Sequence, residues 1–334
     1  MNESNLNQGT LTNPTGGYIT VLENGSRVYE VRVNSDEPLA LWTNEAAFAN
    51  KEWNVGGERT WISPEIDFFM NSNHEYQVPD QLDPGHYKLE AFKDYVKTAQ
   101  IMELTNQRTH QSAQLQLEKT YSLLENPFKA NYHSRFDYVL DVPYVGYQCV
   151  TDLALSSTYA STSDRQEEFI CNAWSITQVP EGGTVLFPTM GAPEPLIMFQ
   201  DPGIVPMVKG DRELRVSYQG NNKFKLSLDV FNSTGRMGYI KPIHAHKSSL
   251  IIKEYQLNLS SVYPDYPDNS PSYLGSCTQF FYDGNQMGSF GELEYHTSAV
   301  SASKPCSTDT ANFYYYVGET AKINFIAKCM LGFI

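Results

Sequence analysis

Apolar residues recur at every second position along much of this chain, and no other feature of the sequence constrains its fold more strongly. The alternation is clear in residues 29–33, 114–121 and 223–230. A period of two is typical of a β-strand with one buried and one exposed face. Turn-forming residues lie between such stretches, as in Asn24-Gly25, Asp83-Pro84-Gly85, Asp201-Pro202-Gly203 and Asp283-Gly284. The pattern predicts an all-β chain with mostly antiparallel strands and not alternating strands and helices.

The domain organisation is predicted from where this pattern stops. Residues 1–17 are polar and lack it, so we expect a flexible leader followed by a single domain over 18–334. All-β folds of this size often form one unit. Residues 86–103 fit either a helix or strands. The proline-rich stretches 190–210 and 258–276 are expected to be long loops, where binding sites tend to lie.

The charge balance excludes some classes of partner. The chain has 38 acidic and 24 basic residues, a formal net charge of −14, without a long acidic run. The charge is therefore expected on a solvated surface. Nucleic acid is not expected as a partner, because its phosphates require a basic patch. No stretch approaches the roughly 20 apolar residues of a membrane span, so we expect no membrane association and a cytoplasmic location.

Cysteine and histidine spacing gives little reason to expect a metal or another cofactor. The cysteines are widely separated, without a Cys-x-x-Cys pair, and are Cys149, Cys171, Cys277, Cys306 and Cys329. They are expected to be reduced, buried thiols. His244 and His246 would lie on one side of a strand, a spacing that occurs in metal sites. Because no third ligand is near, we expect no metal and assign both histidines to ligand binding.

Residues 54–65 combine glycines, an arginine, a tryptophan and glutamates. Gly56 and Gly57 allow a tight turn or a close approach to a ligand. Arg59, Trp61 and Glu65 are the residue types that bind a sugar, since arginine donates to oxygens, an indole stacks on the sugar ring and carboxylates accept hydroxyl protons. The alternative is a glycine turn entering an ordinary strand, with Arg59 and Glu65 paired to each other.

A second cluster lies at residues 290–296. In a strand, Glu292, Glu294 and His296 would point to one face, and Leu293 and Tyr295 to the other. Two carboxylates and an imidazole could bind sugar hydroxyls or move protons, and neighbouring carboxylates raise one pKa. The alternative is the polar outer face of an edge strand.

A third cluster surrounds Trp174, within two expected strands joined by the turn Pro180-Glu181-Gly182-Gly183. This tryptophan is either a stacking platform for a sugar or part of the core. Proximity of Trp174 to Trp61 would favour the first interpretation.

With these clusters described, the chain resembles the galactose mutarotase-like superfamily, in particular its uncharacterised bacterial branches with a Gly-Gly-x-Arg-x-Trp-x-x-Pro-Glu motif. The matching residues are Gly56-Gly57-Glu58-Arg59-Thr60-Trp61-Ile62-Ser63-Pro64-Glu65. Weaker landmarks follow in the same order, namely Trp174-Ser175-Ile176-Thr177 with Gly182-Gly183 and Pro188, then Glu292-Leu293-Glu294. Together they span roughly residues 18–320.

The resemblance implies a β-supersandwich with a concave sugar-binding cleft. It also implies that Arg59 holds the sugar and that either Glu292 or Glu294 is the catalytic carboxylate. The sequence does not distinguish between these two glutamates. Mutarotases carry an acid histidine in a segment that falls near Asn172-Ala173-Trp174, where this chain has none. His133, His244 or His246 could replace it only if the fold brought one of them near.

The sequence therefore predicts a carbohydrate-binding protein of this superfamily. Arg59, Trp61 and Glu65 would form one wall of the cleft, Glu292 and Glu294 the opposite wall, and Trp174 a further ligand contact. The alternative is an aldose 1-epimerase-like or other sugar-modifying enzyme with a glutamate base. A third interpretation is a structural β protein without a small ligand.

Overall fold

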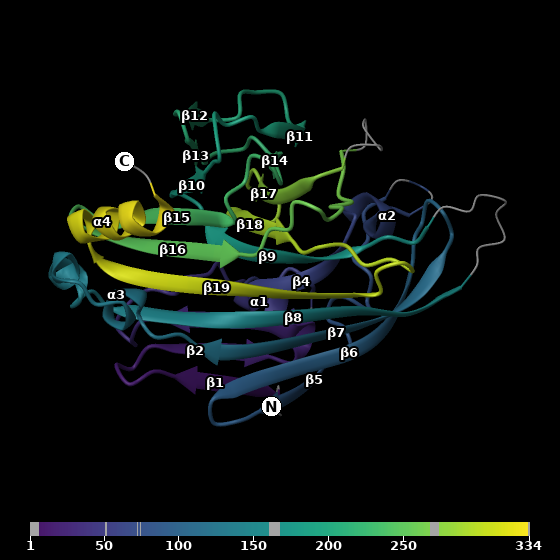
Figure 1. The fold of residues 1–334 in the computed structure, drawn as a ribbon, viewed down its shortest axis with the longest axis horizontal. Helices are drawn as coiled ribbons and strands as arrows, with labels where there is room; N and C mark the ends of the chain where they lie inside the picture. The colour runs from purple at the N-terminus through teal and green to yellow at the C-terminus, as the bar shows by residue number, and fades with distance from the viewer. Residues whose placement is uncertain are drawn as a thin grey trace.

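The computed structural model of the protein describes residues 7–50, 52–71, 73, 75–159, 168–267 and 274–332. These residues form two large sheets, one of nine strands and one of ten (Figure 1). All the strand pairings among them are antiparallel. The predicted fold class, all-β and mostly antiparallel, is confirmed.

The nine-stranded sheet carries the candidate site near its centre. Its strands, in spatial order, are β1 (Gln8–Thr12), β2 (Tyr18–Leu22), β3 (Arg27–Arg32), β4 (Glu58–Ser63), β9 (Asn172–Pro180), β18 (Phe290–His296), β17 (Ser276–Tyr282), β14 (Phe224–Asp229) and β11 (Leu196–Gln200).

The ten-stranded sheet packs against one face of the first. Its strands, in spatial order, are β12 (Met207–Lys209), β13 (Glu213–Ser217), β10 (Thr184–Pro188), β15 (Arg236–His244), β16 (Lys247–Tyr255), β19 (Cys306–Glu319), β8 (Tyr144–Tyr159), β7 (Ser112–Leu123), β6 (Tyr95–Thr105) and β5 (Lys88–Ala91).

The described helices lie outside the space between the two sheets. They are η1 (Asn24–Ser26), α1 (Glu45–Asn50), α2 (Glu65–Phe69), α3 (Pro127–Ala130), η2 (Ser134–Val139) and α4 (Thr320–Leu331). The last helix buries Ile323 and Ile326 against the outer face of the ten-stranded sheet, next to β15 and β16 (Figure 1). None of the described helices combines the length and the apolar character that crossing a bilayer requires.

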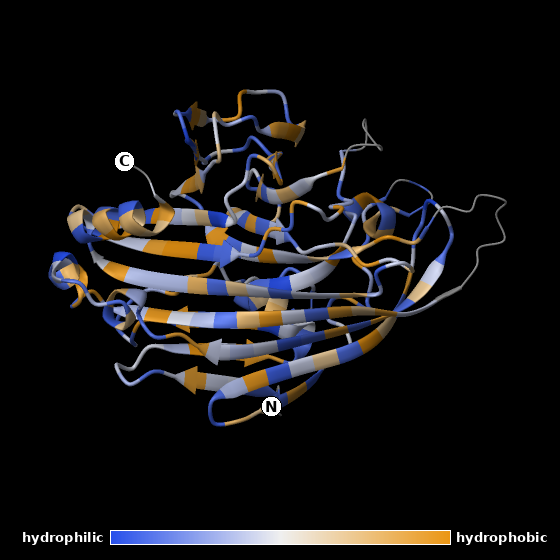
Figure 2. Cartoon of the chain, viewed as in Figure 1, coloured by the Kyte–Doolittle hydropathy of each residue, from blue (hydrophilic) through white to orange (hydrophobic). Residues whose placement is uncertain are grey.

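The main core fills the space between the sheets. Figure 2 shows alternating hydrophobic and hydrophilic bands along the long strands of the ten-stranded sheet, and in β6 these match an alternation of buried and less buried residues. Leu115, Leu117 and Tyr121 of β7 are buried, as the alternation predicted. In β14 the polar residues Lys225 and Ser227 are buried as well, and Lys225 pairs with Glu65 of α2.

Several sequence-based expectations require correction. A flexible leader was expected over residues 1–17, but β1 lies within it and pairs with β2 over five residues. Residues 1–6 lie outside the described part of the chain. The stretch 190–210 contains β11 and β12 and is not one long loop. For residues 86–103, where a helix and strands were the two alternatives, the structure has β5 and most of β6. Three cysteines are buried free thiols, but Cys306 and Cys329 are exposed because they lie near the ends of β19 and α4.

Candidate functional site

Three adjacent strands, β4, β9 and β18, bring the first and last sequence clusters together. Arg59 and Glu294 are both paired with Ile176, one on each side of it. Directly paired residues point to the same face of an antiparallel sheet. Arg59 and Glu294 therefore share a face, and residue alternation adds Trp61 and Glu292 to it. This face is turned away from the second sheet, because the intervening Glu58 and Thr177 contact Lys253 of β16 on the other side.

The two glycines before β4 have a structural role. Gly56 and Gly57 have φ angles of +97° and +80°, which L side chains rarely adopt. A Cβ atom on Gly56 would lie 2.4 Å from the carbonyl oxygen of Trp42, and one on Gly57 would lie 2.4 Å from that of Val28. The two glycines therefore form a tight turn that lets β4 enter a crowded position in the sheet, as one of the two interpretations predicted. Arg59 and Trp61, further along β4, line the pocket described below.

Arg59 is paired with Glu292 and not with Glu65. Its Nη2 atom donates to Glu292 Oε1 at 2.9 Å, and both side chains are almost completely buried. The guanidinium lies over the ring of Trp61, 4.2 Å from the ring centroid. Two other guanidinium nitrogens, Nε and Nη1, have no hydrogen-bond partner among the described residues. Burial raises the pKa of Glu292, and Arg59 opposes this rise without cancelling it.

Lys225 of β14 joins two carboxylates. Its Nζ atom lies 3.1 Å from Glu65 Oε2 and 3.1 Å from Glu294 Oε2. Trp174 Nε1 donates to the same Glu294 oxygen at 2.7 Å. Burial would lower the pKa of Lys225, but the two carboxylates outweigh it and raise that pKa. Burial raises the pKa of Glu294 to about 8, against the effect of Lys225.

A loop and a short helix cover this face of the sheet. The Glu65 backbone N–H at the start of α2 donates to Asp265 Oδ1 at 3.1 Å, and Gln279 Nε2 donates to Asp265 Oδ2 at 2.6 Å. One residue further along the loop, Tyr266 donates its hydroxyl to Asp67 Oδ1 at 2.7 Å. The loop carrying Asp265 and Tyr266 is therefore hydrogen-bonded to both α2 and β17.

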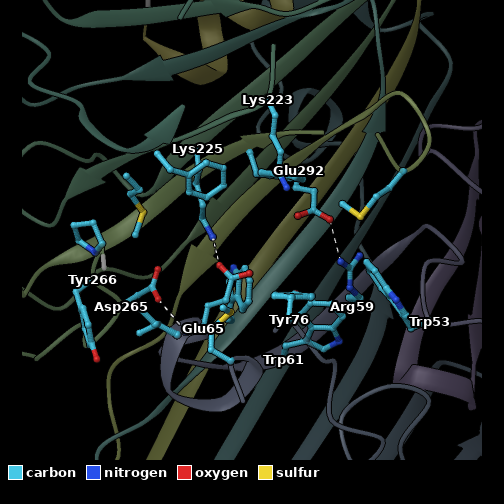
Figure 3. Close-up of a pocket in the computed structure, with 18 residues that line it drawn as sticks. Trp53, Arg59, Trp61, Glu65, Tyr76, Lys223, Lys225, Asp265, Tyr266 and Glu292 are labelled. Carbon is cyan, nitrogen blue, oxygen red and sulfur yellow. Dashed lines mark hydrogen bonds and ion pairs between the residues drawn. The ribbon is translucent and has the colours of Figure 1, made fainter. Parts of the chain in front are cut away.

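These elements enclose a pocket of about 480 Å³ (Figure 3). Its charged lining residues are Arg59, Glu65, Lys223, Lys225, Asp265 and Glu292. Its aromatic lining residues are Trp53, Trp61, Tyr76, Trp174, Phe199, Tyr266 and Phe281. Concave sites with many apolar side chains and a few convergent polar groups are where small ligands bind.

The structure places the residues singled out from the sequence as follows. Arg59, Trp61, Glu65, Trp174 and Glu292 line the pocket together. The indoles of Trp61 and Trp174 are 5.7 Å apart in an edge-to-face arrangement, the proximity that favours a shared role.

Glu294 is fully buried and is not among the residues that line the pocket. The edge-strand interpretation of residues 290–296 is wrong, since β18 is a central strand and every residue in it is buried.

The histidines are distributed differently from expectation. His244 and His246 are exposed at the hairpin between β15 and β16, and His246 lies in the turn itself, so the two imidazoles do not share a strand face. His296 shares the face of Glu294 and stacks on Trp174, with the ring centroids 5.8 Å apart. Burial lowers the pKa of His296 well below its usual value, and Lys225 adds to this. The imidazole is therefore neutral, and it does not line the pocket.

Sequence reasoning did not find Lys223, Lys225, Trp53 and Asp265. The two lysines stand at alternate positions of the predicted strand 223–230, so a shared face was the available signal. Asp265 lies in the predicted loop 258–276, and no local pattern distinguishes it. Within the described ranges, no group of three or more histidine, cysteine, aspartate or glutamate side chains could hold a metal ion.

No protein-family model and no curated protein matches this sequence. Among solved structures, the Slr1438 protein from Synechocystis sp. PCC 6803 is similar with a TM-score of 0.52 and 11% identity over 94% of this chain and 96% of that one. The GalM/aldose epimerase homologue from C. elegans has a TM-score of 0.46 and 9% identity over 94% and 99% of the two chains.

The galactose 1-epimerase from Lactobacillus acidophilus NCFM has a TM-score of 0.44 and 10% identity over 94% and 99%. Galactose mutarotase and aldose epimerase homologues are thus among the similar structures, as the sequence resemblance predicted. At these identities the similarity concerns the fold alone.

Proposed function

We propose that the protein binds a carbohydrate in the pocket formed by β4, β18, α2 and the loop at residues 262–267. The observation that carries the proposal is Arg59, which stacks on Trp61, pairs with Glu292 and keeps two guanidinium nitrogens without a partner among the described residues. Buried donors without acceptors are costly, and ligand oxygens would satisfy them.

The lining of the pocket supports this ligand class. A sugar has an apolar ring face and a rim of hydroxyl groups, and tryptophans beside carboxylates match both. Tyr76 and Phe199 provide exposed aromatic surface above the almost completely buried Trp61 and Trp174, and Glu65 and Glu292 provide acceptors for hydroxyl protons. The third interpretation, a protein without a small ligand, requires a cleft filled by the chain's own side chains, and a volume of about 480 Å³ argues against it.

A sugar-modifying activity is the second candidate function. It is favoured by Glu292, a buried carboxylate of raised pKa that lines the pocket and could accept a proton. Glu65 lines the same pocket from α2, is paired with Lys225 and could accept a second hydroxyl proton. Polarimetry on freshly dissolved aldoses tests this candidate. A rate equal to that of buffer, unchanged by Glu292→Gln and by Glu65→Gln, contradicts it.

Isothermal titration calorimetry with a panel of mono- and oligosaccharides tests the binding proposal. We expect one or more sugars to bind, and Arg59→Met to weaken that binding at least tenfold, because a charged donor to the ligand is lost. Arg236→Met, at an exposed ion pair with Glu254, is the matched control and should bind normally. If no sugar binds to the folded protein, or if Arg59→Met binds as tightly as the parent, the proposal is wrong.

A further inference from the structure

We propose that the carbohydrate is acidic, a hexuronate or a glycan ending in one, and that Lys223 binds its carboxylate. This inference rests on the proposed function, since it concerns the ligand of the same pocket. Lys223 lines the pocket just before β14. The side chains of Lys223 and Lys225 are two residues apart on an extended segment and therefore point to the same face.

The pairing of charges in the pocket singles out this lysine. Arg59 is paired with Glu292, and Lys225 is paired with Glu65 and with the buried Glu294. Lys223 has no carboxylate within ion-pair distance among the residues that the structure describes. It is thus the pocket cation without an ion-pair partner among the described residues, while Asp265, which accepts from the Glu65 N–H and from Gln279, is the lining carboxylate without a lysine or arginine at that distance (Figure 3).

The surroundings of Lys223 hold it in place without satisfying its ammonium group. Nζ lies 5.8 Å from the centroid of Phe199 and 5.6 Å from that of Phe281, so two aromatic rings flank it. Such contacts stabilise a cation but accept none of its three N–H bonds in the way an oxygen does.

The backbone of Lys223 is fixed as well. Its N–H donates to Asp201 Oδ2 at 3.1 Å, and its carbonyl accepts from the Asp201 N–H at 2.8 Å. Gly284, with φ of +63°, packs so closely that a Cβ there would lie 2.7 Å from the Lys223 nitrogen. The fixed backbone sets the point from which the lysine side chain extends into the pocket, which removes part of the entropy lost on binding.

The charge of the ligand group follows from the same balance. A neutral sugar filling the pocket would remove water from Lys223 without giving it a counter-ion, which is unfavourable. A phosphate carries about −1.5 to −2 charges at pH 7, more than one lysine neutralises beside the three lining carboxylates Glu65, Asp265 and Glu292. A carboxylate carries one negative charge, so a hexuronate matches the site better than a sugar phosphate.

Calorimetry at constant ionic strength tests the proposal with three matched ligand series: glucuronate, galacturonate and mannuronate; the parent glucose, galactose and mannose; and their 6-phosphates. We expect a uronate to bind about tenfold more tightly than its parent hexose and its 6-phosphate, the usual gain from one charge-assisted hydrogen bond. Lys223→Met should abolish that preference by weakening uronate binding about tenfold. Lys223→Arg should retain it. Lys209→Met, an exposed lysine on β12 outside the pocket, is the matched control.

The possible failures are distinguishable. If hexoses bind as tightly as uronates, or if Lys223→Met keeps the preference for uronates, this inference is wrong while the proposed function stands. Tighter binding of the 6-phosphates would refute the charge-matching argument in the same way. If no member of any series binds, the proposed function and this inference fail together.

Discussion

Replacing Arg59 with methionine should destabilise the protein strongly, because it leaves the Glu292 carboxylate buried without its cation. The two side chains are 2% and 8% exposed and 2.9 Å apart. Removing one partner of such a buried pair costs about 3–5 kcal/mol. One hydrogen bond to Glu292 Oε1 remains, from Gln178 Nε2 at 3.0 Å, so we expect a loss of about 3 kcal/mol at the lower end of that range.

The loss should also depend on pH. In the variant, Glu292 can become neutral by binding a proton, and burial already raises its pKa in the parent protein. Without Arg59 that pKa rises further, so the folded variant binds a proton that the unfolded chain has released. Its stability relative to the parent therefore falls as pH increases above the pKa of an unfolded glutamate. Arg59→Met should be nearer to normal at pH 5 than at pH 8.

Urea unfolding followed by circular dichroism measures both effects. The double variant Arg59→Met/Glu292→Gln removes the stranded charge, so it should be more stable than Arg59→Met alone. Arg236→Met, at the exposed pair with Glu254, should change the free energy of unfolding far less than Arg59→Met does. A loss under about 1 kcal/mol for Arg59→Met, or one that is independent of pH and not relieved by Glu292→Gln, would refute the reasoning.

Three further predictions follow from buried groups elsewhere. Glu294→Gln should become progressively more stable than the parent as pH rises from about 4.5 to 8, because the unfolded parent ionises this carboxyl over that range while the folded parent, with a pKa of about 8, keeps it protonated. Thermal unfolding across this pH range measures the difference, and parallel curves for the two proteins would contradict it. Lys253→Met should lose about 3–5 kcal/mol in urea unfolding, since it strands Glu58 between the sheets, and Glu58→Gln in the same background should recover part of the loss. A thiol reagent should modify Cys306 and Cys329 in the native protein and all five cysteines after unfolding. Fast reaction of a third thiol in the native protein would contradict the burial of Cys149, Cys171 and Cys277.

Local periodicity was enough to predict the fold class and part of the site. A strand alternates its side chains with a period of two whatever it pairs with, so the shared face of Glu292, Glu294 and His296 could be stated from residues 290–296 alone. The same reasoning located the strands that contain Arg59 and Trp174. It could not show that β18 is central, because a polar strand face looks alike at an edge and beneath a covered pocket.

The tertiary structure alone decided which of these faces meet and which charges pair. Arg59 and Glu292 are 233 residues apart, and their ion pair depends on the order β4-β9-β18 and on the register of both pairings. Lys225 enters the site from β14, Lys223 from the position before it and Asp265 from a loop. The expected His244 and His246 lie in an exposed hairpin. Sheet order and register are set by the packing of whole strands over long sequence separations, so no local pattern encodes them.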